Sequence, residues 1–253
     1  AYFYLERFEP LLAATSELVK LQNTPQEFQF ALAIYHAKAL FAQDSNSAIG
    51  FEYVNKAKAI YQQRHAIYVA PRRMIFYANL LLEEADKIRQ QVSKQEHMAT
   101  LREAYHVLNQ VKKDYMHLSA PDFQIDLYSN LYQVSTRIEN HTKAIYYQKK
   151  AVFWAKQQSN KRTIGVVIYN LARAYHNLGQ QQKAVDIFNE SLVYFKQAKD
   201  EVSIIDCHLR LAESYKELGQ FEKVQRNMEI VDTLSLSLPL NKWQLKLKSE
   251  IVN

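Results

Sequence analysis

Three sets of polar residues recur along this chain at a spacing of about 40 residues. The sets are Asn130, Gln133 and Arg137; Asn170, Arg173 and Asn177; and Arg210, Glu213 and Glu217. An amide both donates and accepts hydrogen bonds, so Asn130 and Asn170 could pair with the backbone of an extended peptide, whatever its side chains are. Arg137, Arg173 and Arg210 could hold a carboxylate through forked, charge-assisted hydrogen bonds.

The alternative is that these nine residues are ordinary solvated side chains on exposed helix faces. Any one of them fits that interpretation when it is taken alone. Clustering on one surface favours binding instead, because binding concavities gather a few convergent polar groups. The elements that carry these residues therefore decide between the two interpretations.

No motif for catalysis or metal binding accompanies them. The eight histidines include no His-x3-His pair with a helical Glu, no Cys joins a His at ligand spacing, and there is no glycine-rich phosphate loop or Gly-x-Ser-x-Gly elbow. We interpret His208 as a packing residue and Cys207 as a buried, inert thiol. The sequence therefore predicts no enzymatic activity, no metal site and no cofactor.

A repeat with a period of 40 residues positions the three sets. The clearest unit reads Ile168-x2-Leu171-Ala172-x2-Tyr175, then Gly179 and Ala184-x3-Phe188. The next reads His208-x2-Leu211-Ala212-x2-Tyr215, then Gly219 and Val224-x3-Met228, and the one before reads Tyr128-x2-Leu131-Tyr132-x2-Ser135 with Ala144-x3-Gln148. Small residues let two helices approach closely, while Leu and aromatic residues fill the groove between them. The pattern therefore predicts helical hairpins.

Glycine and proline mark where these helices end and begin. Gly179 and Gly219, each within Leu-Gly-Gln, supply the left-handed residue after a helix, and Pro25, Pro71 and Pro121 suit a first helical position. The predicted helices run over 10–22, 25–43, 46–65, 71–92, 97–117, 122–138, 141–158, 161–178, 181–198, 201–218, 221–236 and 240–252.

The composition agrees with an all-α protein and limits its partners. Only four Gly and five Pro interrupt 253 residues, and one cysteine cannot form an internal disulfide, which favours a cytoplasmic protein. No apolar run reaches the roughly 20 residues that cross a bilayer. The net charge of +6 is spread along the chain rather than gathered in a block, so we predict no direct nucleic-acid binding and no membrane binding.

The quoted residues resemble the tetratricopeptide motif, most specifically over 164–232. This resemblance implies an all-α, right-handed superhelical solenoid of hairpins. The repeat, six residues longer than the usual unit, is similar to those of the RRNPP group of bacterial peptide-pheromone receptors, which includes the Rap phosphatases and the Rgg- and PlcR-like regulators. What that similarity implies is a regulatory domain of a quorum-sensing protein that binds a short signalling peptide and controls an N-terminal effector.

The resemblance also implies where a peptide would lie. In such hairpins the first helix of each pair lines the concave side, and the nine polar residues occupy the positions that point into it. We divide the chain into an N-terminal lead-in at 1–24, which could be the tail of a missing and DNA-binding effector domain, degenerate hairpins at 25–120, three repeats at 121–238, and a capping helix at 239–253.

Two other interpretations stay open or are discounted. The protein could be a scaffold that binds a folded partner, or self-associates as a homodimer, without any small peptide. The carboxylate clamp of chaperone-binding tetratricopeptide domains fits less well. Asn170 and Arg210 match it, but Ser129, Gln133 and Asp206 occupy its other positions.

Overall fold

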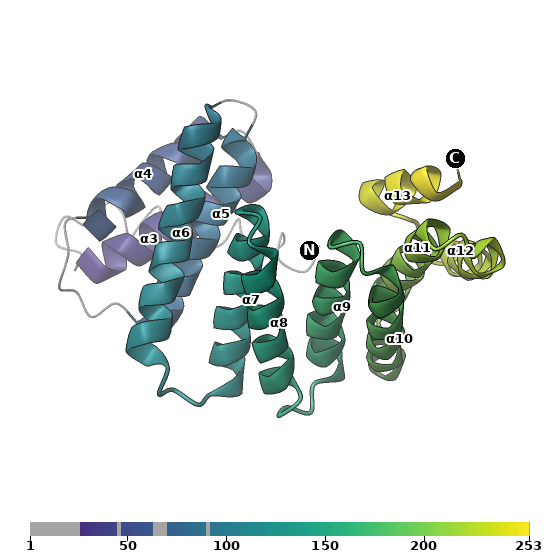
Figure 1. The fold of residues 1–253 in the computed structure, drawn as a ribbon. Coiled ribbons are helices and arrows are strands. Elements are labelled where there is room, and N and C mark those ends of the chain that lie inside the picture. Colours follow the sequence, from purple (N-terminus) through teal and green to yellow (C-terminus); the bar gives the residue numbers. More distant parts are fainter. Residues whose placement is uncertain (1–25, 45–46, 63–69, 90–91, 253) are drawn as a thin grey trace. The chain divides into compact units, whose positions relative to one another are not determined.

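The computed structural model describes residues 26–44, 47–62, 70–89 and 92–252, and these residues form helices joined by short turns (Figure 1). They divide into two compact units that meet between Leu118 and Ser119. In the described part of the chain there is no strand and no helix that is long and apolar enough to cross a membrane. The predicted all-α fold is therefore confirmed. The helix predicted at 10–22, Pro25 and the lead-in at 1–24 lie outside the described residues.

The described part of the first unit contains two helical hairpins. Its helices are α3 (Gln26–Gln43), α4 (Ala48–Gln62), α5 (Pro71–Ile88) and α6 (Lys94–Tyr115), with α3 packed on α4 and α5 packed on α6. Tyr77 is fully buried at their centre, where its ring meets Phe30 edge-on and its hydroxyl donates to Glu103 at 2.7 Å.

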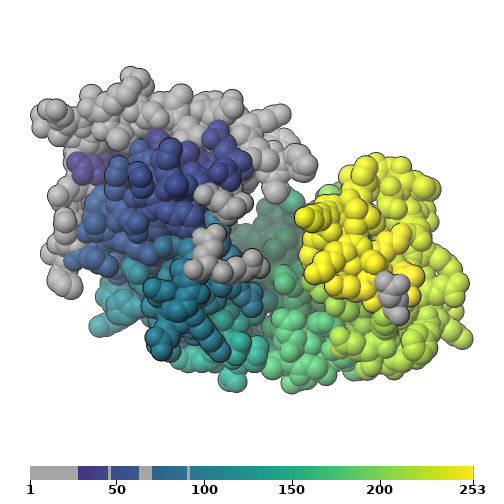
Figure 2. Space-filling view, turned by 90° about the horizontal axis from the view of Figure 1, so that it is seen from above, coloured from purple at the N-terminus to yellow at the C-terminus, as the bar shows by residue number. Residues whose placement is uncertain are grey.

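The second unit contains three hairpins and a final helix. The hairpins are α7 (Pro121–Arg137) with α8 (His141–Ala155), α9 (Lys161–Asn177) with α10 (Gln181–Ala198), and α11 (Glu201–Glu217) with α12 (Phe221–Ser235). Helix α13 (Lys242–Val252) follows and packs on α11. Figure 2 shows this yellow C-terminal helix lying against the yellow-green part of the unit. Where residues are described, the predicted helix limits agree with the observed ones to within four residues.

The residues of the 40-residue period pack as the pattern predicts. Ala144, Ala184, Ala151 and Ser191 are buried, and the hydroxyl of Ser191 lies 3.6 Å from the sulfur of Cys207 in the next hairpin. One core cluster joins Leu171, Tyr175 and Phe188 of the middle hairpin to Cys207 and Leu211 of α11. Because each hairpin buries its apolar face against the next one, the three hairpins share a continuous core.

The turns between paired helices share one geometry. Gly179 and Gly219 have φ of +72° and +69°, and in each turn the glycine N–H and the following N–H donate back to the last helical turn. This Schellman arrangement satisfies carbonyls that the helix end leaves unpaired. Glu139 holds the same left-handed place between α7 and α8 with a φ of 60°, and Lys199 holds it between α10 and the next hairpin with a φ of 54°, although neither is glycine. The sequence predicts all of these turns, but it identifies the left-handed residue only in the two turns that contain glycine.

Candidate functional site

The nine predicted site residues lie on the first helices of the three hairpins of the second unit, α7, α9 and α11. They differ widely in how much each side chain can offer a ligand. Asn130 is buried, at 6% exposure, and its amide group donates to the carbonyl of Asp126 at 2.8 Å. Its amide oxygen is buried without a partner among the described residues. Asn130 therefore presents little to a ligand, and Asn170 in the next hairpin presents more.

Asn170, Gln133 and Asn177 keep their side-chain amides available. Asn170 and Gln133 are half-buried and Asn177 is exposed. None of the three amides hydrogen-bonds with another residue in the part of the chain that the structure describes. Each amide can therefore pair with the backbone of a bound segment without breaking an existing contact.

The arginines of the three helices influence the pKa values of two nearby tyrosines. Tyr132 on α7 is buried and Tyr169 on α9 is half-buried, and burial raises both pKa values, that of Tyr169 to about 12. The charge of Arg173 lowers both pKa values, and Arg137 acts on Tyr132 in the same sense. Arg137 of α7 and Arg173 of α9 thus both influence the phenol group of Tyr132.

Arg173 and Arg210 lie on corresponding helices, α9 and α11, but have different surroundings. Arg173 is half-buried and forms no ion pair or hydrogen bond with the residues that the structure describes. Arg210 pairs with Glu213 at 2.7 Å on its own helix, and its guanidinium stacks over the ring of Trp243 at 4.9 Å. Glu213 therefore already pairs with Arg210 as a ligand carboxylate would.

Asp206 introduces a negative charge beside these arginines. Burial raises the pKa of its carboxyl group, and this effect outweighs the lowering by a hydrogen bond from Gln244 at 2.6 Å and by the charges of Arg210 and Arg173. Asp206 thus partly neutralises the arginine pair. It also ties α11 to α13.

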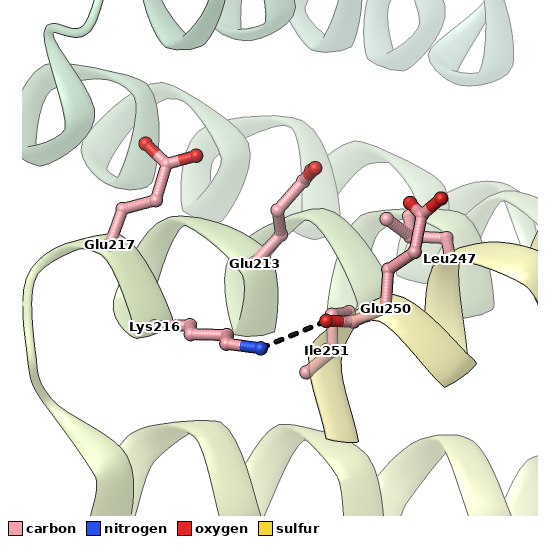
Figure 3. Close-up of a pocket in the computed structure, with 6 residues that line it drawn as sticks. All are labelled: Glu213, Lys216, Glu217, Leu247, Glu250 and Ile251. Carbon is pink, nitrogen blue, oxygen red and sulfur yellow. Dashed lines mark hydrogen bonds between the residues drawn. The ribbon is translucent and has the colours of Figure 1, made fainter. Parts of the chain in front are cut away.

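Glu213 and Glu217 line a pocket between α11 and α13, with a volume of about 400 Å³. Its other lining residues are Lys216, Leu247, Glu250 and Ile251, drawn in Figure 3. Lys216 donates from α11 to the backbone carbonyl of Glu250 at 2.9 Å, and this contact crosses the pocket. The pocket is therefore partly closed by contacts within the chain.

His176 connects this region to α9 in an arrangement that contains the residue types of a catalytic triad. Its Nδ1 lies 3.1 Å from the hydroxyl of Ser214, and its Nε2 lies 3.5 Å from Glu213. Ser214 is fully buried within α11, so no substrate carbonyl can reach its oxygen. The arrangement therefore joins two helices, and Ser214 is no nucleophile.

Cys207 and His208 are buried, as predicted. Burial raises the pKa of the Cys207 thiol to about 12, and its Sγ donates to the carbonyl of Phe188 at 3.2 Å. Burial lowers the pKa of His208, whose Nδ1 lies 2.8 Å from the side-chain oxygen of Asn227. Sequence reading did not identify Tyr169, Asp206 or Trp243 as part of this region. Tyr169 and Asp206 lie four residues before Arg173 and Arg210, a spacing that places each pair on one helix face, whereas Trp243 required the position of α13.

Comparison with known proteins supports the repeat. Residues 167–192, which span most of α9 and the first part of α10, match the family model for the tetratricopeptide repeat. No curated protein matches the sequence significantly.

The solved structures show the fold. The kinesin light chain TPR-like repeats of Podosopora anserina superpose with a TM-score of 0.64 at 16% identity, over 85% of this chain and 98% of that one. The apo form of RapI superposes with a TM-score of 0.69 at 10% identity, over 98% of this chain and 69% of RapI. A Rap protein complexed with Competence and Sporulation Factor superposes with a TM-score of 0.58 at 14% identity, over 85% of this chain and 56% of the Rap protein. This chain therefore spans about half of that protein. The chain thus has a tetratricopeptide-repeat fold that resembles those of Rap-type receptors.

Proposed function

We propose that this protein is a regulatory sensor that binds a short peptide on the face formed by α7, α9 and α11 and thereby biases an attached effector. The single observation that carries the proposal is Arg173, which is half-buried and has no ion pair in the described part of the chain. Withdrawing a guanidinium from water is costly unless a partner compensates. A bound carboxylate is a partner of the right charge and geometry.

The neighbours of Arg173 suit the rest of a peptide. Asn170 and Gln133 have unpaired amides that can hydrogen-bond to a peptide backbone. Arg137 lies close enough to act on Tyr132, the same ring on which Arg173 acts. We therefore assign the peptide carboxylate to Arg173, and the peptide backbone to Asn170 and Gln133. The fold similarity to a Rap protein complexed with Competence and Sporulation Factor supports this assignment.

In this role the protein is a signalling component of the cytoplasm. Its described residues bind a peptide and do not catalyse a reaction. Binding energy would act by favouring one arrangement of the hairpins over another, and it can shift that equilibrium only by the difference in affinity between the two states. A transcription-regulating effector domain encoded upstream would then sense the change.

Calorimetry with peptides encoded by short reading frames beside the gene tests the proposal. We expect wild type to bind at least one such peptide, Asn170→Ala to bind it more weakly, and Arg173→Ala to bind it roughly tenfold or more weakly, since a charge-assisted pair contributes about 1.5–3 kcal/mol. Arg226→Ala on the exposed face of α12 is the matched control and should bind as wild type does.

A peptide with an amidated C-terminus separates the carboxylate assignment from general binding. Amidation should weaken binding to wild type and leave binding to Arg173→Ala nearly unchanged, because the two changes remove the same interaction. Equal affinity of all three proteins for both peptides would reject Arg173 and Asn170 as site residues.

The alternative is an interaction scaffold that binds folded proteins without a small peptide. The similarity in fold to kinesin light chain repeats favours this alternative, as do the large apolar side chains that lie exposed on the second unit, such as Tyr146 and Phe153. An upstream coding sequence with no helix-turn-helix or helical effector domain would support the scaffold over the sensor.

A further inference from the structure

Acidic residues are distributed unevenly along the chain. Between Glu139 and Asp186 the sequence contains no acidic residue, although the chain has 26 of them. The same stretch contains Lys143, Lys149, Lys150, Lys156, Lys161, Arg162, Arg173 and Lys183. Helix α8 lies within this stretch, so its solvent-exposed face carries positive charge only.

Two large aromatic side chains lie exposed on that face of α8. Tyr146 is 55% exposed and Phe153 is 57% exposed, whereas Ala144, Tyr147 and Ala151 on the opposite face are buried. The two rings are seven residues apart, which places them on one side of the helix at roughly 10 Å along its axis. Exposed rings of this size are candidates for burial by a partner, because aromatic residues supply much of the apolar area at protein interfaces.

The lysines between the two rings are not neutralised. Lys149 and Lys150 are exposed and have no acidic partner among the described residues, and Lys150 lies 5.8 Å from the centre of the Tyr146 ring. By contrast, Lys156 at the end of α8 pairs with Glu190 at 2.9 Å, and Arg162 pairs with Asp200 at 2.6 Å. Two unpaired positive charges therefore lie beside the exposed rings.

We infer that the face of α8 formed by Tyr146, Lys149, Lys150 and Phe153 docks a helix of another protein that carries acidic and apolar residues on one side. The apolar residues of that helix cover the two rings, and its carboxylates pair with the two lysines. Charge complementarity selects the partner, since α8 offers no acidic residue to repel or compete with such a segment. This surface is separate from the proposed peptide site, whose residues lie on α7, α9 and α11.

A nucleic acid fits the same surface less well. Binding to a phosphate backbone depends on the number of cations that displace counterions, and two unpaired lysines give only weak binding at physiological salt. A duplex would also leave the two rings without an apolar partner. A protein helix accounts for both the rings and the lysines.

Selection from a displayed library of helix-forming peptides of roughly 18 residues tests the inference. The library is panned against the full chain and counter-selected against a variant that combines Tyr146→Ala, Lys149→Glu and Phe153→Ala. We expect enriched peptides with apolar residues seven apart and acidic residues between them. Their affinity for the variant should fall at least tenfold. Asn170→Ala and Arg173→Ala should bind them as wild type does, which separates this surface from the peptide site.

Controls distinguish loss of the surface from loss of the fold. Val193→Ala with Lys196→Glu makes a comparable change on the exposed face of α10 and should leave the selected peptides bound. All three substitutions on α8 replace exposed side chains, so circular dichroism and thermal unfolding should match wild type. Enriched peptides without acidic residues, equal binding to the variant, or no enrichment at all would overturn the inference. A thymidine oligonucleotide or vesicles of phosphatidylcholine and phosphatidylserine that bind through the same four residues would overturn it as well.

Discussion

Gln148 of α8 donates from its side-chain amide to the backbone carbonyl of Val167 in α9 at 2.7 Å, and both residues are buried. In the next hairpin the corresponding position is filled by the ring of Phe188, which is fully buried. A hydrogen bond between hairpins thus occupies a place where the repeat otherwise uses an apolar side chain. The other amide atom, Oε1 of Gln148, is buried without a partner among the described residues.

We expect Gln148→Met to raise the free energy of unfolding by about 1 kcal/mol, because it removes a buried, unpaired acceptor at similar volume. The carbonyl of Val167 would keep the hydrogen bond that the helix itself provides. Denaturant unfolding of the purified chain measures the change. Phe188→Gln is the reciprocal variant and should lose roughly 3 kcal/mol or more. A less stable Gln148→Met would show that the contact with Val167 is required for packing of α8 on α9.

Gly165 in α9 faces the ring of Phe195 in α10 so closely that a side chain at this position would meet the ring. A Cβ atom at this position would lie 2.8 Å from the ring of Phe195, which is buried. Alanine gains about 0.5–1 kcal/mol of helix propensity, but overpacking a core costs about 1–3 kcal/mol, so we expect Gly165→Ala to destabilise the protein. The same substitution in a Phe195→Leu background should cost less, and an equal cost in both backgrounds would contradict the steric explanation.

Lys199 occupies the left-handed position after α10 with a φ of 54°. Because side chains other than glycine are strained there by roughly 1–2 kcal/mol, Lys199→Gly should raise the midpoint of thermal unfolding. Gly219 holds the matching position after α11, and nothing lies within 4 Å of a Cβ built on it. Gly219→Ala should therefore lower the midpoint through backbone strain alone. Opposite signs for the two variants are the expected result, and a stabilising Gly219→Ala would refute the assignment.

Asp206 predicts a dependence of stability on pH. Burial raises the pKa of its carboxyl group above the value in the unfolded chain, so the folded state favours the protonated form. The stabilisation from this group is complete below the unfolded pKa of 3.8 and is lost as the pH rises through the folded pKa. Asp206→Asn should therefore be more stable than wild type at neutral pH, and the advantage should shrink in acid.

Chemical unfolding of both proteins over a series of pH values measures this difference. The asparagine oxygen can still accept the hydrogen bond from Gln244, so the tie between α11 and α13 should persist. An advantage of Asp206→Asn that is independent of pH would mean that the carboxylate charge is not its cause.

Local features of the sequence determine the helices and their pairing. Pro121 begins α7, Gly179 and Gly219 end α9 and α11, and the recurring Ala144 and Ala184 mark close approach within a hairpin. These features can be identified from sequence because each depends on the conformation of a few neighbouring residues, and the repeat presents them several times. The helix limits predict turns at Glu139 and Lys199, but not their left-handed conformation, because the helices on either side impose it on residues that do not favour it.

The repeat is enough to identify which polar residues share a helix face, because a fixed period and 3.6 residues per turn place them. Which of these residues remain available to a ligand depends on how the helices pack. Arg173 and Arg210 are 37 residues apart on corresponding helices. Arg173 has no ion pair within the described residues, whereas Arg210 pairs with Glu213 and stacks on the ring of Trp243. The physical reason is that solvation and pairing depend on contacts between distant segments. The position of α13 over α11 sets those contacts, and the period does not encode it.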